Sequence, residues 1–236
     1  MRGIRFGALS LFGALSLGAF AFLASVGGTA AQTTSSAVLN SLELQELIKR
    51  AEPADHTRLE VHFAVLAEQY AADAKRHSAM AQAFIASPTR RTAANSAAGH
   101  CRRLEQLNLQ SAATLRQLAA YHEGLGAGKA SAKPRGAERF EGGAGAPAPS
   151  TEEVTALAAK ASTPADHHAL REYFGTLAKR YAADADRHVA MAQAYRGTRI
   201  TQAAVHCDRL AALSRDEAKE ATEAAAMHKQ LAGVAR

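Results

Sequence analysis

The chain contains the same long segment twice, and this internal repeat limits its fold more than any other feature. Residues 53–84 read PADHTRLEVHFAVLAEQYAADAKRHSAMAQAF, and residues 164–195 read PADHHALREYFGTLAKRYAADADRHVAMAQAY. Twenty of these 32 positions are identical at a constant offset of 111 residues. The match resumes at an offset of 106, where HCRRL from His100 corresponds to HCDRL from His206. A duplication of this kind predicts two structurally equivalent halves.

Both copies carry the pattern of a long helix, a turn and a second long helix. Pro53 and Pro164 fit the first turn of a helix, where a missing N–H leaves no bond unmade. After each proline, apolar residues recur at alternating steps of three and four, which places them on one helix face. Pro88 and Gly197 interrupt this pattern. We predict helical hairpins at 39–123 and 151–232, each with a short leading helix, at about 39–51 and 152–161.

The two predicted hairpins are separated by residues 124–150, which contain seven glycines, three prolines and no apolar run. This composition is typical of a flexible linker. Because one hairpin alone buries little apolar surface, we expect an all-α fold in which the two hairpins pack as an antiparallel four-helix bundle. The alternative is that each hairpin pairs with another chain in a homo-oligomer, and the length of the linker allows either arrangement.

Residues 1–31 have the pattern of a signal peptide. Arg2 and Arg5 precede an uncharged apolar run from Phe6 to Val26, and small residues lead to Ala31. We therefore predict cleavage after Ala31, a periplasmic or secreted location, and no stable membrane span in the mature protein. The alternative is an uncleaved anchor, because the apolar run is long enough to cross a bilayer.

The charge and the motifs of the mature chain argue against two large functional classes. Residues 32–236 contain 26 basic and 22 acidic residues, a formal charge of +4 with no block of five like charges. With no tryptophan and few other aromatic residues to stack on bases, we expect no nucleic-acid binding. The sequence has no Gly-x-Ser-x-Gly, Walker, His-Glu-x-x-His or Glu-x-x-His motif, so an enzymatic role is not expected.

Polar residues that recur on the buried stripes are the candidate functional residues. Folding each hairpin about its turn places a His and a Met of the first helix level with a His–Cys pair of the second. Asp73 and Asp184 lie four residues before their histidines and are expected to accept an N–H from them. The predicted metal ligands are His77, Met80, His100, Cys101, His188, Met191, His206 and Cys207, and a further histidine layer contains His56, His122, His167 and His228.

These layers have three interpretations. Imidazole with thiolate and thioether suits copper(I), and imidazole with thiolate and carboxylate suits zinc, so the chain is expected to bind Cu or Zn. Alternatively, the layers are structural, in a non-catalytic structural or protein-interaction bundle, and Cys101 and Cys207 form a disulfide in an oxidising compartment. Haem has less support, because Cys-x-x-Cys-His is absent and few aromatic residues are available to surround a porphyrin.

Overall fold

The computed structural model describes residues 38–87, 91–126 and 149–234, which all belong to one compact unit within residues 36–236. The described residues contain helices and no strand, so the predicted all-α fold is confirmed. In this part of the chain, no helix is both long enough and apolar enough to cross a membrane. The predicted signal peptide and most of the predicted linker lie outside the described residues. The helices are α1 (Ser41–Arg50), α2 (Pro53–Ala86), α3 (Arg91–Gly126), α4 (Thr151–Lys160), α5 (Pro164–Arg196) and α6 (Gln202–Val234).

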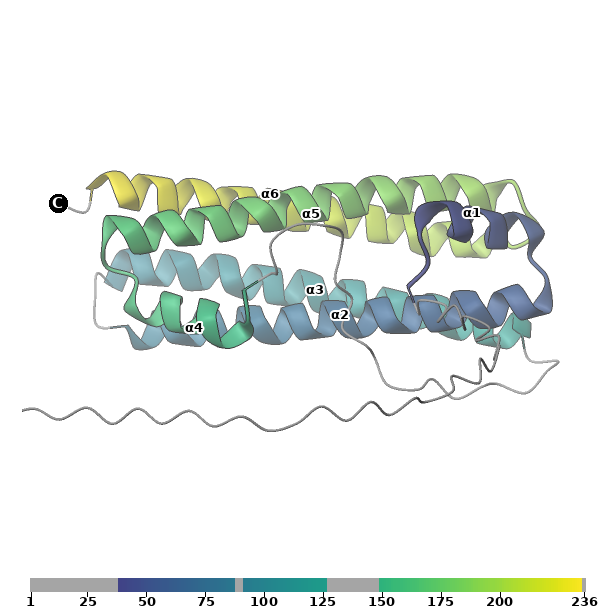
Figure 1. The fold of residues 1–236 in the computed structure, drawn as a ribbon, viewed down its shortest axis with the longest axis horizontal. Helices are drawn as coiled ribbons and strands as arrows, with labels where there is room; N and C mark the ends of the chain where they lie inside the picture. Colours follow the sequence, from purple (N-terminus) through teal and green to yellow (C-terminus); the bar gives the residue numbers. More distant parts are fainter. Residues whose placement is uncertain (1–37, 88–90, 127–148, 235–236) are drawn as a thin grey trace, which may run out of the picture. The chain divides into compact units, whose positions relative to one another are not determined.

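The four long helices form the predicted antiparallel bundle (Figure 1). Helix α2 packs along α3, α5 packs along α6, and the two hairpins meet where α3 packs against α6. The ends of α3 and α5 lie together, since His122 contacts Tyr195, and the ends of α2 and α6 lie together, since Phe84 stacks on His228. The two hairpins therefore point in opposite directions. We call the two ends of the bundle the Ala86 end and the Gly197 end.

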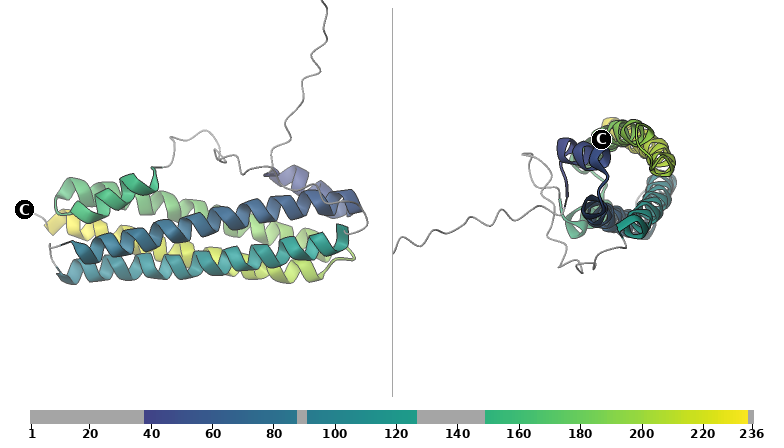
Figure 2. Two further views of the ribbon diagram at one scale, coloured as in Figure 1. Left: turned by 90° about the horizontal axis from the view of Figure 1, so that it is seen from below. Right: turned by 90° about the vertical axis from the view of Figure 1, so that its right-hand side faces the viewer.

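The short helices α1 and α4 each cross to the other hairpin. Helix α1 leads into α2 but also packs on α5, and α4 leads into α5 but also packs on α2. Together they cover the seam between α2 and α5, whose Cα atoms do not come within 8 Å of each other (Figure 2). The seam between α3 and α6 has no such cover. The direct interface between long helices of the two hairpins is therefore the α3–α6 contact.

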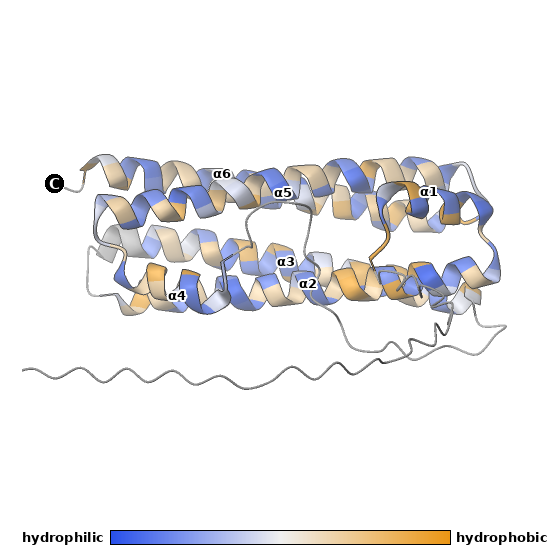
Figure 3. Cartoon of the chain, viewed as in Figure 1, coloured by the Kyte–Doolittle hydropathy of each residue, from blue (hydrophilic) through white to orange (hydrophobic). Residues whose placement is uncertain are grey.

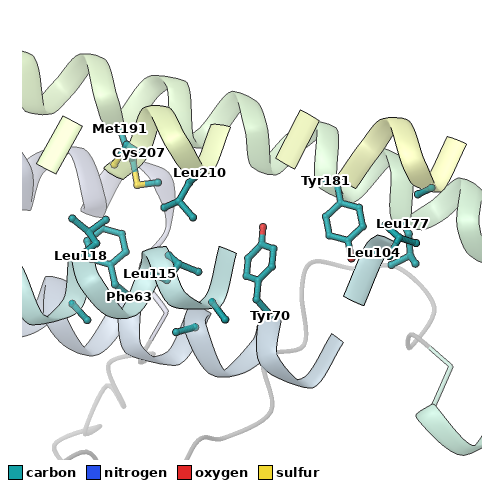
Figure 4. Close-up of a cluster of buried hydrophobic side chains, with 14 of the residues drawn as sticks. Phe63, Tyr70, Leu104, Leu115, Leu118, Leu177, Tyr181, Met191, Cys207 and Leu210 are labelled. Atoms are coloured by element: carbon teal, nitrogen blue, oxygen red, sulfur yellow. The ribbon is translucent and has the colours of Figure 1, made fainter. Parts of the chain in front are cut away.

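The core is built from the apolar stripes that the repeat predicted. Hydrophobic and hydrophilic residues are interspersed along every long helix (Figure 3). The close-up shows Phe63 and Leu115 of the first hairpin facing Cys207 and Leu210 of the second (Figure 4). Each of these four side chains is fully buried. Burial of a side chain of this size contributes roughly 1.5–3 kcal/mol to folding, so the shared interior stabilises the pairing of the hairpins.

The helix ends follow local sequence signals, with two small departures from the predicted ranges. Thr163 caps α5, because its Oγ1 accepts the N–H of Asp166 at 3.2 Å. Helix α3 extends to Gly126, three residues into the predicted linker. A Cβ at Gly126 would stand 3.3 Å from Thr57 Oγ1, so the missing side chain lets the end of α3 approach the start of α2. Helix α6 begins at Gln202, after a turn over residues 197–201, and ends at Val234, two residues past the predicted end of the second hairpin.

Candidate functional site

The outer histidines form one buried pair in each hairpin. The Nδ1 atoms of His56 and His122 lie 3.0 Å apart, and those of His167 and His228 lie 3.2 Å apart. Burial and the neighbouring imidazole of His56 lower the pKa of His122 to about 3. A neutral imidazole carries one N–H and one lone pair, so each pair forms a single hydrogen bond between its two rings. This arrangement is that of a structural polar layer.

The inner residues are not gathered as the sequence predicted. His77 is fully buried, and neither of its ring nitrogens has a hydrogen-bond partner. His100 turns away from α2 toward α6, where its Nδ1 lies 2.6 Å from Glu220 Oε1. Met80 and Met191 are buried in the apolar core. Within the described residues, neither His77, His100 and Cys101 nor His188, His206 and Cys207 form a group of three whose ligand atoms all lie within 4.8 Å of one another.

The two aspartates bind arginines and a tyrosine instead of the histidines. Asp73 forms ion pairs with Arg76, at 2.7 Å, and with Arg180 of the other hairpin. Asp184 pairs with Arg187 and accepts a hydrogen bond from the Tyr70 hydroxyl at 3.2 Å. The predicted hydrogen bond from His77 to Asp73 is not formed. The aspartates pair with guanidinium groups because a cationic donor adds a direct charge–charge attraction to the carboxylate, which a neutral imidazole does not offer.

The two cysteines are free thiols, so the disulfide that the sequence left open is not formed. His100, next to Cys101, pairs with Glu220, which lies thirteen residues from Cys207 along α6. Thirteen helical residues span about 20 Å, whereas bridged cysteines need Cα atoms within about 7 Å. Burial raises the pKa of both thiols to about 12. With no cation beside them, both thiols therefore remain protonated at neutral pH.

A different group of ligands lies where the two hairpins meet. His100 on α3 and the carboxylates of Glu220 and Glu223 on α6 place one ligand atom each within 4.8 Å of one another. It is the one group of three or more such ligands in the described part of the chain. His100 and Glu220 are partly buried, and Glu223 is more exposed, with the Lys219 ammonium 4.0 Å away. An imidazole and two carboxylates in this arrangement can hold a cation.

The sequence predicted His100 as a metal ligand, but together with His77, Met80 and Cys101, and it did not indicate the two glutamates. Residues three apart share a helix face, so the spacing of Glu220 and Glu223 signals a pair of carboxylates. Nothing along the chain shows that this face of α6 packs against His100. At the offset of 106, Thr114 and Gln117 replace the two glutamates, so the equivalent of His100 in the second hairpin lacks carboxylates. The candidate site is therefore single, and the repeat does not duplicate it.

A second unusual imidazole lies near the site. His228 is buried, and its Nε2 has no hydrogen-bond partner. Burial, followed by the imidazoles of His167 and His100, lowers its pKa to about 3. At the Gly197 end, the corresponding Nε2 of His122 lies 2.8 Å from the Tyr195 hydroxyl. Phe84 occupies the position equivalent to Tyr195 and has no hydroxyl to offer.

The centre of the bundle holds a buried carboxyl group that sequence analysis also missed. Glu217 accepts a hydrogen bond from the Ser111 hydroxyl at 2.9 Å, while its second oxygen has no partner. Burial raises the pKa of Glu217 to about 8. Nearby, Asn108 and Tyr181 join the two hairpins by a hydrogen bond of 3.0 Å. The position of Glu217 on the buried stripe of α6 was the available signal.

Comparison with known proteins gives no match: no family model, no curated protein and no solved structure matches this chain. Each hairpin nevertheless has a close relative in the other hairpin of the same chain. Positions at which the two copies differ, such as Glu220 with Thr114 and Phe84 with Tyr195, therefore identify what is particular to one end of the bundle.

Proposed function

We propose that this protein is an exported helical bundle that binds one divalent transition-metal ion between its two hairpins, with His100, Glu220 and Glu223 as ligands. The observation that carries the proposal is that one ligand atom from each residue lies within 4.8 Å of the other two. Ligand atoms of a tetrahedral zinc site stand about 3.3 Å apart, as follows from metal–ligand bonds of about 2.0–2.1 Å. Small side-chain rotations are enough to reach that geometry.

The ligand types favour a borderline or hard divalent ion. Imidazole and carboxylate together suit Zn²⁺, and they also suit Mn²⁺ and Fe²⁺. Copper(I) prefers thiolate and thioether ligands, and the nearest thiol, that of Cys101, is held protonated by burial and by the charge of Glu220. We therefore propose Zn²⁺ as the first ion to test, with one ion per chain rather than one per hairpin.

The other buried polar residues support a structural role beside this binding role. The two histidine pairs, His56 with His122 and His167 with His228, form hydrogen bonds within their own hairpins. Polar contacts of this kind in a bundle seam specify which helices pair and in which register. Export is proposed from the pattern of residues 1–31.

Metal titration of matched variants tests the proposal. Chelator-treated mature protein is titrated with Zn²⁺ by calorimetry, and bound metal is counted after desalting. The parent protein is expected to bind one ion per chain, and His100→Ala to bind none. The matched control is His206→Ala, which changes the equivalent histidine of the second hairpin and is expected to bind like the parent. Glu223→Gln is expected to weaken binding at least tenfold.

Two outcomes contradict the proposal. If the parent takes up no Zn²⁺, Mn²⁺ or Fe²⁺, the metal-binding function fails and the structural interpretation stands. If His77→Ala abolishes binding while His100→Ala does not, the ion binds within the hairpin at the residues that the sequence first indicated. Because binding to a folded protein raises its stability by mass action, the unfolding temperature of each variant provides an independent readout.

A further inference from the structure

We infer that the bound ion holds the two hairpins together, so that the metal concentration controls how readily the hairpins separate. This inference rests on the proposed metal site and concerns its regulation. The three ligands are divided between the hairpins: His100 belongs to α3, and Glu220 and Glu223 belong to α6. An ion held by all three must be released, or lose a ligand, before α3 and α6 separate.

An ion bound at the α3–α6 contact is expected to oppose separation of the two hairpins more than an ion bound elsewhere. This contact is the place where long helices of the two hairpins pack directly, since the α2–α5 seam is bridged by the short helices α1 and α4 (Figure 2). Two side-chain contacts also cross the α2–α5 seam: a hydrogen bond from Tyr70 to Asp184 and an ion pair between Asp73 and Arg180. Those contacts lie near the middle of the bundle. Toward the Ala86 end, Arg76 of α2 donates a hydrogen bond of 3.3 Å to Thr151 of α4, so this end is linked there through a short helix.

The two ends of the bundle differ in how the hairpins are linked. At the Gly197 end, the Tyr195 hydroxyl of the second hairpin lies 2.8 Å from Nε2 of His122 in the first hairpin, and both groups are buried. At the Ala86 end, Phe84 faces His228, whose Nε2 has no partner, so the equivalent link is missing. The metal ligands lie toward this same end, since Glu223 is five residues from His228 on α6 and His100 is nine residues from the start of α3 that follows Ala86. An ion held by His100, Glu220 and Glu223 strengthens the link between the hairpins that the hydrogen bond of His100 with Glu220 already begins.

Separation of the hairpins can be measured in the whole protein after its linker is cut. A site for a sequence-specific protease is inserted within residues 127–148, the folded protein is cut, and both halves remain present. The dissociation constant of the two halves is then measured by dilution, with Zn²⁺ or with chelator. When the free Zn²⁺ concentration is 100 times the dissociation constant of the ion, the dissociation constant of the two halves is expected to fall about 100-fold.

Variants separate failure of this inference from failure of the proposed function. In His100→Ala the dissociation constant of the halves is expected to be independent of Zn²⁺, whereas His206→Ala is expected to respond like the parent. If the parent binds one Zn²⁺ but its halves separate equally with and without the ion, the role of the ion in holding the hairpins together is refuted while the metal site stands. If the parent binds no Zn²⁺, both are refuted. Should His100→Ala fold poorly, Glu223→Gln provides the same comparison from α6.

Discussion

Replacing Phe84 with tyrosine is expected to stabilise the protein, because the other half of the chain already shows where the added hydroxyl would go. Tyr195 is the equivalent of Phe84 at the offset of 111, and His122 is the equivalent of His228 at the offset of 106. Nε2 of His122 has the Tyr195 hydroxyl as its partner, and Nε2 of His228 has none. Phe84→Tyr should therefore give His228 its missing hydrogen bond.

The expected magnitude follows from what each imidazole gains or loses. A neutral intramolecular hydrogen bond contributes about 0.5–1.5 kcal/mol, and leaving a buried polar group unsatisfied costs about 1–3 kcal/mol. Phe84→Tyr makes the bond and relieves the unsatisfied Nε2, so we expect a gain of about 1–2 kcal/mol in the free energy of unfolding. Tyr195→Phe does the reverse at His122 and should lose about 1–3 kcal/mol.

The assay is equilibrium unfolding in urea, followed by far-ultraviolet circular dichroism at neutral pH with chelator present. Chelator removes any contribution from an ion bound at His100. The two substitutions lie at opposite ends of the bundle, so their effects should add in the double variant. That variant, Phe84→Tyr with Tyr195→Phe, moves the tyrosine from one end to the other and should unfold within about 1 kcal/mol of the parent.

A destabilising effect of Phe84→Tyr would refute the reasoning. It would show that the space beside Phe84 does not match the space beside Tyr195, so that the added oxygen is either crowded or unpaired. A loss for Tyr195→Phe of less than about 0.5 kcal/mol would refute it from the other side, because the bond to His122 would then contribute nothing measurable. Crystal or solution structures of Phe84→Tyr would locate the new hydroxyl directly.

Two further substitutions test other buried polar groups. Burial raises the pKa of Glu217 from its ordinary value of 4.5 to about 8 in the folded protein. The protonated group therefore contributes fully to stability below about pH 4.5, and this contribution is lost as pH rises through 8. The loss in the free energy of unfolding is at most about 5 kcal/mol. Glu217→Gln should flatten the dependence of unfolding free energy on pH between 5 and 9, and an unchanged slope in urea titrations would contradict this. His77→Leu should raise stability by about 1–3 kcal/mol, because it removes two buried nitrogens without partners. A loss of stability together with a loss of metal uptake in His77→Leu would instead assign the ion to the first hairpin.

Local pattern was sufficient to predict the helices and their buried faces. The residues at alternating steps of three and four from Leu59 to Phe84 lie on the buried side of α2, because the period of a helix is a property of the chain itself. The all-α class, the two hairpins and the four-helix bundle followed from that period and from the repeat. His62, which has no counterpart in the second copy, is buried and accepts the Leu39 N–H at 3.1 Å. That contact depends on the packing of α1, which no local pattern encodes.

The tertiary structure alone decided how the polar residues are combined. The position of the turn in the sequence predicts that His100 lies level with His77. It does not predict which neighbouring helix the His100 side chain contacts. Only the antiparallel pairing of the hairpins brings Glu220 and Glu223 to His100, and the same pairing keeps Cys101 and Cys207 apart. Hydrophobic stripes are nearly the same in either relative direction of two helical hairpins, so the burial of apolar surface does not choose between them. The choice depends on contacts between residues more than a hundred positions apart, such as Tyr70 with Asp184 and Ser111 with Glu217.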